Sequence, residues 1–336
     1  MLSSSSASPR SSSSCVSSAW LGSSRPLFAV RCLVLVFSMI FVSNRSGLTA
    51  LTVSPVGAGC GLCFYGVENI AFDSAENLYI TDTDHNSRFR VLKVSSEGKL
   101  LDEWHVFEGG QNEAKGPEGI ALDHDGNILV TDEGSLSVLR ISQAGKILGR
   151  IGGPEANFED LGHVVVDASG FIYVSEAALN RIQKFSPSGK RLEVWKRSKG
   201  SGAEQWGGIE SIALGRGGTL AVEDWPNRRI VVLSPSGQTL RSFGSRGEDP
   251  GQFANSAGLC ADAAGNLYVP DQKLHRIQKF DANGHLLFTF AAENGVALFK
   301  EGPTGIAVDA HGNLFAPDGL TIVKLSPAEK LLKRWR

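Results

Sequence analysis

The chain has 336 residues and is nearly neutral, with 33 lysines and arginines against 35 aspartates and glutamates, a net charge of −2 and a sequence pI of about 6.4. A protein that binds nucleic acid through phosphate contacts usually carries an excess of basic charge on the domain or on one face. This chain shows no such excess, so we expect no nucleic-acid partner.

Residues 1–50 form a leader of unusual composition. Serine dominates, no aspartate or glutamate occurs before Glu68, and residues 32–42 are an apolar stretch of 11 residues preceded by Arg31. That stretch is shorter than the roughly 20 residues needed to cross a bilayer and is typical of a signal-peptide core. We expect export, either with cleavage near residues 49–50 or with the leader retained as a membrane anchor. A serine-rich, arginine-bearing, acid-free leader is also typical of organelle targeting, which is the alternative.

Residues 51–65 are a linker that contains Cys60 and Cys63. The chain has five cysteines in all, and a lone Cys-x-x-Cys lacks the second pair that a zinc site needs. In an exported protein this pair can close a small disulfide loop, and two unpaired thiols are the alternative. Cys260 lies within an apolar strand pattern, which indicates an inert core residue.

From residue 66 to residue 336 the sequence repeats itself six times. Three copies are closely alike: GIALDHDGNILVTD from Gly119, GLCADAAGNLYVPD from Gly258 and GIAVDAHGNLFAPD from Gly305. Every copy ends on an acidic residue, and these residues are separated by 50, 44, 48, 47 and 47 positions: Asp82, Asp132, Glu176, Asp224, Asp271 and Asp318. A period in the forties, with short strands and glycine turns, predicts the blades of a β-propeller.

Each repeat contains four strand-length apolar runs separated by turns. In the fifth copy, turns rich in Asp, Gly and Asn follow these runs. Gly and Asn tolerate positive φ, so such turns suit tight hairpins. Four antiparallel strands repeated radially give an all-β, six-bladed β-propeller of four-stranded antiparallel blades. The last copy, which ends at residue 336, has its own fourth strand, so the ring needs no strand from the other terminus. Whether residues 51–56 add a strand is open.

The stretch 250–284, PGQFANSAGLCADAAGNLYVPDQKLHRIQKFDANG, closely resembles the NHL repeat. The resemblance covers six units and is weakest in the fourth, where 215–218 replace the usual turn. It implies a six-bladed propeller. It does not imply one activity, because NHL proteins include ligand-binding modules, protein- and RNA-binding domains and a lyase.

A candidate site lies where the innermost strands begin, around the central channel. The residue just before each inner strand should point toward the axis, and reading round the ring gives Glu68, Glu118, Gly162, Glu210, Ala257 and Thr304. Three converging carboxylates repel one another and stay charged together only beside a cation, unless one holds a proton. Oxygen ligands of this kind suit calcium. We therefore predict a metal site of Glu68, Glu118, Glu210 and His163, with solvated rim residues as the alternative.

Two enzyme families resemble this chain in repeat style. Calcium propellers of the gluconolactonase-like family carry acidic and Asn ligands at similar rim positions, but Gly162, Ala257 and Thr304 stand where further ligands would help. The NHL-like lyase that cleaves hydroxyglycine peptides needs several inward-facing histidines for zinc. Of the seven histidines here, only His163 and the loop residues His85, His105 and His275 could reach the rim. Three converging histidines are not evident, so we do not expect that activity.

The other recurring residues have structural interpretations. The six strand-ending acids should accept backbone N–H groups of the loop that follows them in every blade. Four arginines that open third strands should tie blades together: Arg90, Arg181, Arg229 and Arg276. In blade four, Trp206 and Trp225 are predicted either to form an aromatic lip for a peptide or sugar, or to cover the irregular turn of that blade.

The sequence contains no recognisable nucleophile–base–acid set and no phosphate loop, so no catalytic or cofactor-binding residue is assigned. The favoured function is an exported or membrane-anchored NHL-type propeller that binds a protein, peptide or glycan through its loop-rich face. The alternative is a calcium- or zinc-assisted hydrolase or lyase with its site at the central channel. A membrane partner is expected only through the leader.

Overall fold

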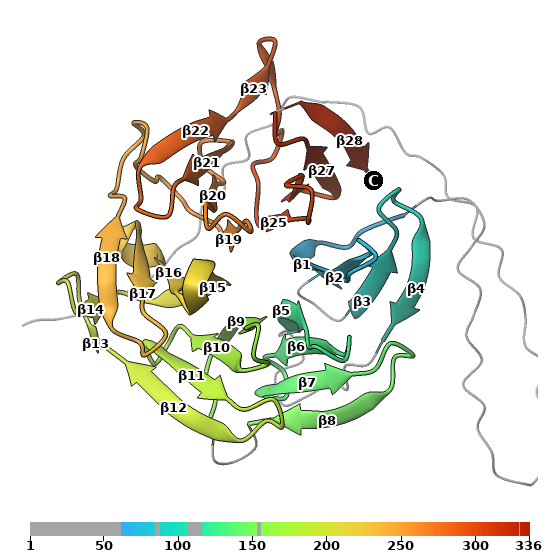
Figure 1. The fold of residues 1–336 in the computed structure, drawn as a ribbon. Coiled ribbons are helices and arrows are strands. Elements are labelled where there is room, and N and C mark those ends of the chain that lie inside the picture. Colours follow the sequence, from blue (N-terminus) through green and yellow to red (C-terminus); the bar gives the residue numbers. More distant parts are fainter. Residues whose placement is uncertain (1–61, 85–87, 106–115, 153–155, 329) are drawn as a thin grey trace, which may run out of the picture. The chain divides into compact units, whose positions relative to one another are not determined.

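The structure, a computed structural model, describes residues 62–84, 88–105, 116–152, 156–328 and 330–336. These belong to the second of two compact units of the chain, residues 57–336. The leader, Cys60 and residues 51–56 lie outside the described residues. Within this unit, six four-stranded antiparallel sheets surround a central axis, which confirms the predicted propeller (Figure 1).

The first three blades have these strands. Blade 1 comprises β1 (Val67–Phe72), β2 (Leu78–Thr83), β3 (Phe89–Val94) and β4 (Leu100–Trp104). Blade 2 comprises β5 (Pro117–Leu122), β6 (Ile128–Asp132), β7 (Ser137–Ile141) and β8 (Ile147–Ile151). Blade 3 comprises β9 (Leu161–Val166), β10 (Ile172–Glu176), β11 (Arg181–Phe185) and β12 (Arg191–Lys196).

The last three blades carry additional short elements. Blade 4 comprises β15 (Ile209–Leu214), β16 (Leu220–Asp224), β17 (Arg229–Leu233) and β18 (Thr239–Phe243), with 3-10 turns η1 (Arg216–Gly218) and η2 (Trp225–Asn227). Blade 5 comprises β19 (Cys260–Ala261), β20 (Leu267–Asp271), β21 (Arg276–Phe280) and β22 (Leu286–Phe290). Blade 6 comprises β25 (Ala307–Val308), β26 (Leu314–Asp318), β27 (Thr321–Leu325) and β28 (Leu331–Trp335). Two small two-stranded ribbons precede blades 4 and 6: β13 (Ser198–Lys199) with β14 (Gln205–Trp206), and β23 (Ala292–Glu293) with β24 (Val296–Ala297).

The Asp-x-x-Gly-Asn turns explain the hairpin between the first two strands of a blade. Asp123 Oδ1 accepts the backbone N–H groups of Asp125 (3.0 Å) and Asn127 (2.8 Å), and its Oδ2 accepts the Asn127 amide at 3.1 Å. Gly126 supplies the positive φ of 77° that closes the turn. Asp73, Asp262 and Asp309 make the same set of bonds in blades 1, 5 and 6.

The apolar core is divided among the interfaces between blades. Each of six buried clusters draws its side chains from two adjacent blades, and one of them joins blade 6 to blade 1 through Phe315, Trp335, Ile70 and Ile80. The second strand of every blade is buried along its whole length. A blade therefore gains most of its stability from its neighbours, as expected of radial repeats.

Blade 6 closes the ring with its own fourth strand, as the sequence predicted. The Trp335 ring from β28 packs against Phe315 with a centroid distance of 5.5 Å and lies over Gly98 of the blade 1 turn. A Cβ on Gly98 would lie within 2.4 Å of that ring, so this position needs glycine. Lys333 Nζ also donates to the Glu97 carbonyl at 2.7 Å.

The inner strands of blades 5 and 6 are shorter than the other four. Prolines occupy the penultimate position of their second strands, at Pro270 and Pro317, and proline has no N–H to donate to the inner strand. Pairing beyond that point survives only as isolated bridges, Ser256 with Asp271 and Pro303 with Asp318.

Candidate functional site: the mouth of the central channel

The strand-ending acids accept backbone N–H groups, as predicted, but in five blades the donors lie in the loop that enters the blade and not in the loop that follows the acid, which corrects the prediction. Asp132 accepts the N–H group of Gly134 in the following loop. Asp82 is fully buried, and its Oδ1 accepts the N–H groups of Tyr65 (2.8 Å) and Gly66 (2.9 Å). Asp271 does the same for Ala254 (2.8 Å) and Asn255 (2.9 Å). These carboxylates fix the chain immediately before the inner strands, and thus fix the position of the residues at the axis.

The arginines that open the third strands bind the same acids and loops. Arg90 Nε donates to Asp82 at 2.6 Å, and its Nη2 donates to the Cys63 carbonyl. Arg229 pairs with Asp224 at 2.9 Å and donates to the Gln205 carbonyl at 2.7 Å. The predicted ties are therefore made between a blade and the loop that leads into it from the preceding blade.

A chain of buried hydroxyls then links the inner strands of the first four blades. Thr131 Oγ1 accepts the Gly119 N–H at 2.8 Å and donates to the Gly162 carbonyl of blade 3 at 2.7 Å. Thr81 bonds the Glu118 carbonyl at 3.0 Å, and Ser175 bonds the Glu210 carbonyl at 2.5 Å. Two of the three axial glutamates are thus positioned by a hydroxyl of the preceding blade.

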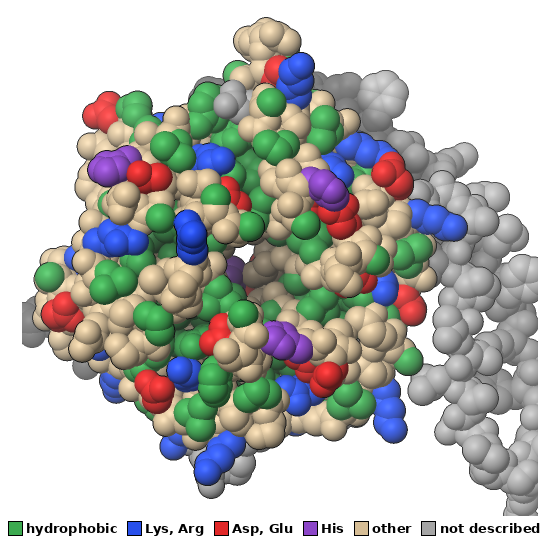
Figure 2. Space-filling model, in the orientation of Figure 1, with side chains coloured by type: hydrophobic (Ala, Val, Ile, Leu, Met, Phe, Trp, Pro, Cys, Tyr) green, Lys and Arg blue, Asp and Glu red, His purple; other side chains and the backbone are tan. Residues whose placement is uncertain are grey.

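The axial glutamates border a cavity of about 290 Å³, which we call the mouth. The predicted residues Glu68, Glu118, Glu210 and His163 all line it. Ala257 and Thr304 line it as well, so the inference that residues before the inner strands face the axis is confirmed for these positions. Among the described residues, no lysine or arginine is part of the lining. Figure 2 shows a narrow opening at the centre of the ring.

The mouth raises the pKa of its carboxyl groups. Burial and four neighbouring carboxylates raise the pKa of Glu118 from 4.5 to about 8: Glu68, Glu210, Glu133 and Asp160. Burial, with Asp160 and Glu133, also raises the pKa of Glu210. The Glu210 side chain still meets solvent, but it lies in a concavity where protein surrounds most of it.

Glu223 is a buried carboxyl that the sequence analysis missed. Burial raises its pKa to about 8, with Glu210 adding to the shift. Its Oε2 accepts the Gly258 N–H of blade 5 at 2.9 Å, while its buried Oε1 has no partner among the described residues. Aligning the repeats could have revealed Glu223 as an exception. The residue before the strand-ending acid is Thr, Thr, Ser, Glu, Pro and Pro in blades 1 to 6.

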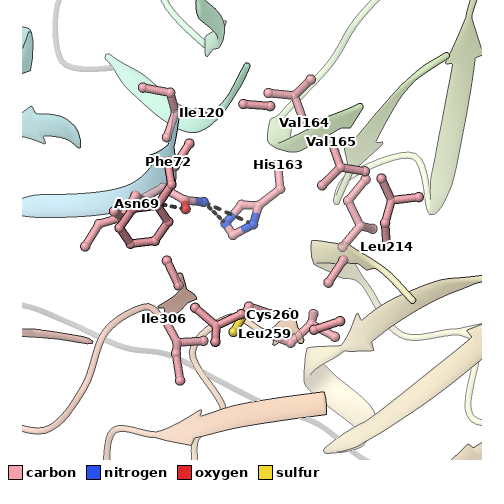
Figure 3. Close-up of a pocket in the computed structure, with 18 of the residues that line it drawn as sticks. Asn69, Phe72, Ile120, His163, Val164, Val165, Leu214, Leu259, Cys260 and Ile306 are labelled. Carbon is pink, nitrogen blue, oxygen red and sulfur yellow. Dashed lines mark hydrogen bonds between the residues drawn. The ribbon is translucent and has the colours of Figure 1, made fainter. Parts of the chain in front are cut away.

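His163 forms the floor of the mouth. Figure 3 shows its ring beside Asn69, whose Nδ2 lies 3.2 Å from both ring nitrogens. Ser211 Oγ lies 3.0 Å from Nδ1 and accepts the Leu259 N–H at 3.1 Å. Asn69 Oδ1 accepts the Ile70 N–H at 2.8 Å, and this bond leaves the NH₂ group of Asn69 facing the imidazole. A donor facing the ring favours neutral imidazole, and desolvation of the half-buried side chain lowers the His163 pKa to about 4.

Below His163 the channel widens into a second cavity of about 300 Å³. Its walls are mainly apolar side chains of the inner strands, including Phe72, Ile120, Leu214 and Ile306 (Figure 3). Cys260 also faces it, and burial raises the pKa of that thiol, which keeps it protonated, as expected of an inert cysteine. His163 therefore lies between the two cavities and lines both of them.

The two predicted tryptophans have different environments. Trp225 is 41% exposed and lines the mouth, as a lip residue should. Trp206 has no exposed surface and packs in the core between blades 3 and 4. The lip interpretation is therefore wrong for Trp206, because the β13–β14 ribbon folds its ring inward. The ring is a core residue between the two blades, and its cluster includes none of residues 215–218, the turn that the alternative had it cover.

The potential ligands in the mouth suit a cation that prefers oxygen ligands better than they suit zinc. His163 is the only described histidine that lines either cavity, and both its nitrogens face neighbours. The predicted ligands share one cavity, but the described residues whose ligand atoms all lie within 4.8 Å of one another are Glu76, Asp309 and His311, in turns on the opposite face. In that group Asp309 is already occupied by its turn. Ligation in the mouth would require the glutamates to rotate inward.

Comparison with known proteins gives partial matches. A family described as the SMP-30/Gluconolactonase/LRE-like region matches residues 69–159, which is less than half of the chain. The peptidyl-glycine alpha-amidating monooxygenases of Mus musculus and Rattus norvegicus are 35% and 36% identical over 195 residues, covering 49% of this chain. The chain spans only 20% of the length of these relatives.

Two of the similar solved structures are enzymes. A virginiamycin B lyase from Staphylococcus aureus aligns with a TM-score of 0.56 at 17% identity, over 81% of this chain and 84% of its own. A gluconolactonase from Xanthomonas campestris gives a TM-score of 0.57 at 16% identity, over 77% and 85%. At such identities the likeness shows the fold alone. The six-bladed propeller is therefore established, whereas the NHL resemblance stays a resemblance.

Proposed function

We propose that the protein is a cation-assisted hydrolase or lyase whose site is the mouth of the channel. The observation that carries this proposal is the convergence of glutamates from three blades in one cavity, with the pKa of Glu118 and Glu210 raised by burial and by their neighbours. Carboxyls with strongly shifted pKa values in a concave site are candidates for ligation or proton transfer. The partial match to the gluconolactonase-like family and the lyase and gluconolactonase fold relatives support the same class.

Calcium is the cation that the chemistry of these residues fits. Glu68, Glu118 and Glu210 offer hard carboxylate oxygens, and Asn255 adds an amide at the same cavity. When bound, such a cation polarises a substrate carbonyl and acidifies water. Glu118 would then give up the proton that it holds at neutral pH, because a positive charge reverses the repulsion that raises its pKa.

The remaining side chains would orient the substrate and transfer protons. The neutral His163 ring with Ser211 and Asn69 forms a fixed polar floor against which a substrate polar group can be placed. Glu210, whose pKa is raised while it still meets solvent, is suited to accept or return a proton. Trp225 covers one side of the mouth and would exclude water from a bound substrate.

Calcium titration of the full-length protein tests the proposal. We expect one calcium ion bound per chain by calorimetry, a higher melting temperature in calcium than in chelator, and loss of both effects in Glu210→Gln. The matched control is Glu248→Gln, an exposed glutamate in the loop before blade 5, which should behave like wild type. Activity would then be screened on lactones and modified peptides with and without chelator. Absence of calcium binding in wild type would overturn the proposal.

A binding scaffold for a protein, peptide or glycan is the second candidate. It is favoured by the exposed Trp225 at the mouth and by the ribbon β23–β24, which projects from the ring and leaves Val296 71% exposed (Figure 1). Binding to peptide and glycan arrays that is lost in Trp225→Ala and insensitive to chelator would favour it. Arrays without signal, together with calcium-dependent turnover, would exclude it.

Export remains part of this proposal. We propose that residues 1–50 direct the chain out of the cytoplasm or anchor it, with organelle targeting as the alternative. None of the helices in the part of the chain that the structure describes is long and apolar enough to span a bilayer. N-terminal sequencing of protein expressed in its native cell type would show cleavage near residue 50 if the leader is a signal peptide.

A further inference from the structure

Arg228 is a buried cation without a counterion, at the blade 4 side of the mouth. It is 8% exposed, and its Nε and Nη1 atoms are buried and make no hydrogen bond. No ion pair to Arg228 is present among the described residues. Buried charges in proteins are almost always paired and hydrogen-bonded, so this guanidinium requires an explanation.

The backbone does not need arginine at this position. Arg228 follows the turn η2 with a φ of 53°, a left-handed conformation that ends the loop between the second and third strands. The corresponding residues of blades 2, 3 and 5 adopt φ values of 47°, 49° and 50° and are Leu136, Asn180 and His275. Any of these types makes the turn, so among blades 2 to 5 the long cationic side chain is a feature of blade 4 alone.

Nearby acids do not neutralise Arg228. Asp271 already accepts the N–H groups of Ala254 and Asn255. Glu223 accepts the Gly258 N–H, and burial raises its pKa to about 8, so it is mostly neutral at pH 7. Burial, followed by the like charge of Arg246, lowers the Arg228 pKa in spite of both acids. This corner of the blade 4–5 seam therefore has an excess of positive charge.

The guanidinium borders the mouth through Trp225. Its central carbon lies 4.7 Å from the centre of the indole ring, and that ring lines the mouth together with Asn255 and Gln272. The indole is 41% exposed, so it can turn aside and admit a ligand to the guanidinium. Side-chain rotations of this size at binding sites are common.

We propose that Arg228 is the anchor of an anion-binding subsite at the rim of the mouth, and that its ligand is the carboxylate group of a small organic molecule. Each edge of a guanidinium presents two N–H groups that match the two carboxylate oxygens. Trp225 would pack against the body of the ligand, and Arg246, exposed and bonded to the Pro226 carbonyl at 3.4 Å, would add positive charge at the entrance. The subsite does not depend on a cation in the mouth.

Benzoate is the probe, with benzamide as its neutral counterpart of the same shape. Calorimetry on the full-length protein in chelator, at low ionic strength, should show benzoate binding and no measurable benzamide binding. Arg228→Met should weaken benzoate by about 10-fold or more, as expected when one partner of a desolvated charge pair is removed. Arg216→Met makes the same charge change in the turn at the other end of blade 4, where the side chain is exposed, and should leave the affinity within about 2-fold of wild type.

Two further readouts separate this subsite from a structural role. Without ligand, Arg228→Met should melt no lower than wild type, because it removes an unpaired buried charge. Wild-type crystals soaked with 4-bromobenzoate should show anomalous bromine signal beside Trp225 and Arg228. Equal binding of benzoate and benzamide, unchanged affinity in Arg228→Met, or bromine only elsewhere would each overturn the proposal. Because chelator is present throughout, a failure of the calcium proposal would not affect this result.

Discussion

The carboxyl of Glu118 should make the stability of the folded protein fall as pH rises. Its pKa is raised from 4.5 to about 8 on folding, so between these values the native state holds a proton that the unfolded state has released. The free energy of unfolding then decreases by up to about 1.4 kcal/mol per pH unit in that window. The stabilising effect of the proton is complete below pH 4.5 and lost above about pH 8.

The full shift corresponds to an upper limit of about 5 kcal/mol, and water in the partly open mouth should reduce it to about 2 kcal/mol. Glu118→Gln keeps the shape and removes the titration. In chelator, urea unfolding should give equal stability for variant and wild type near pH 5, and a more stable variant near pH 8. Glu248→Gln should follow wild type at every pH. A Glu118→Gln profile that runs parallel to wild type would refute the assignment of the shift to this residue.

Three other substitutions probe the framework of the mouth, each by urea unfolding. Glu223→Thr restores the residue type of blades 1 and 2 and should raise stability near pH 8 by about 1–2 kcal/mol; a loss would mean that the Gly258 N–H bond outweighs the buried carboxyl. Thr131→Val should cost about 2 kcal/mol, since it leaves the Gly119 N–H and the Gly162 carbonyl without a partner; a neutral result would show that water replaces the hydroxyl. Asp82→Asn should cost about 3 kcal/mol by removing the partner of the buried Arg90, whereas a cost below about 1 kcal/mol would mean that Glu103 suffices for that arginine.

The repeat pattern predicted the fold because the same local rules act in every blade. The third and fourth strands of blade 5 are two of the short apolar runs of the repeat, 276–280 and 286–290. The acids that close the second strands, such as Asp82 and Asp271, bind loop N–H groups as predicted, although the loop is the one that enters the blade. These interactions are local and recur six times, so the sequence reveals them by repetition.

The site was harder to predict because its residues come from different blades. The axial position of Glu68, Glu118 and Glu210 followed from the repeat, but the hydroxyls that orient them did not, since each bonds a carbonyl about 30 to 40 residues away. Trp206 was misjudged because its burial depends on the parallel β13–β14 ribbon, which has no counterpart in the other loops that the structure describes. Glu223 was overlooked because it reads as one more acid at the end of a strand.

Blade 4 is the blade that departs most from the repeat, and it contributes most of the unusual chemistry at the mouth. Glu210, Glu223, Trp225 and Arg228 all belong to it, and two of them are buried with unpaired polar atoms. A blade with a purely structural role would be expected to give these groups hydrogen-bond partners. Thr131 does so for the Gly119 N–H and the Gly162 carbonyl. Unsatisfied polar groups cost stability and persist where function requires them. The axial glutamates of blades 1, 2 and 4 would hold a cation, and the further groups of blade 4 would orient a substrate, with its anionic end toward Arg228 and its reactive end toward Glu118.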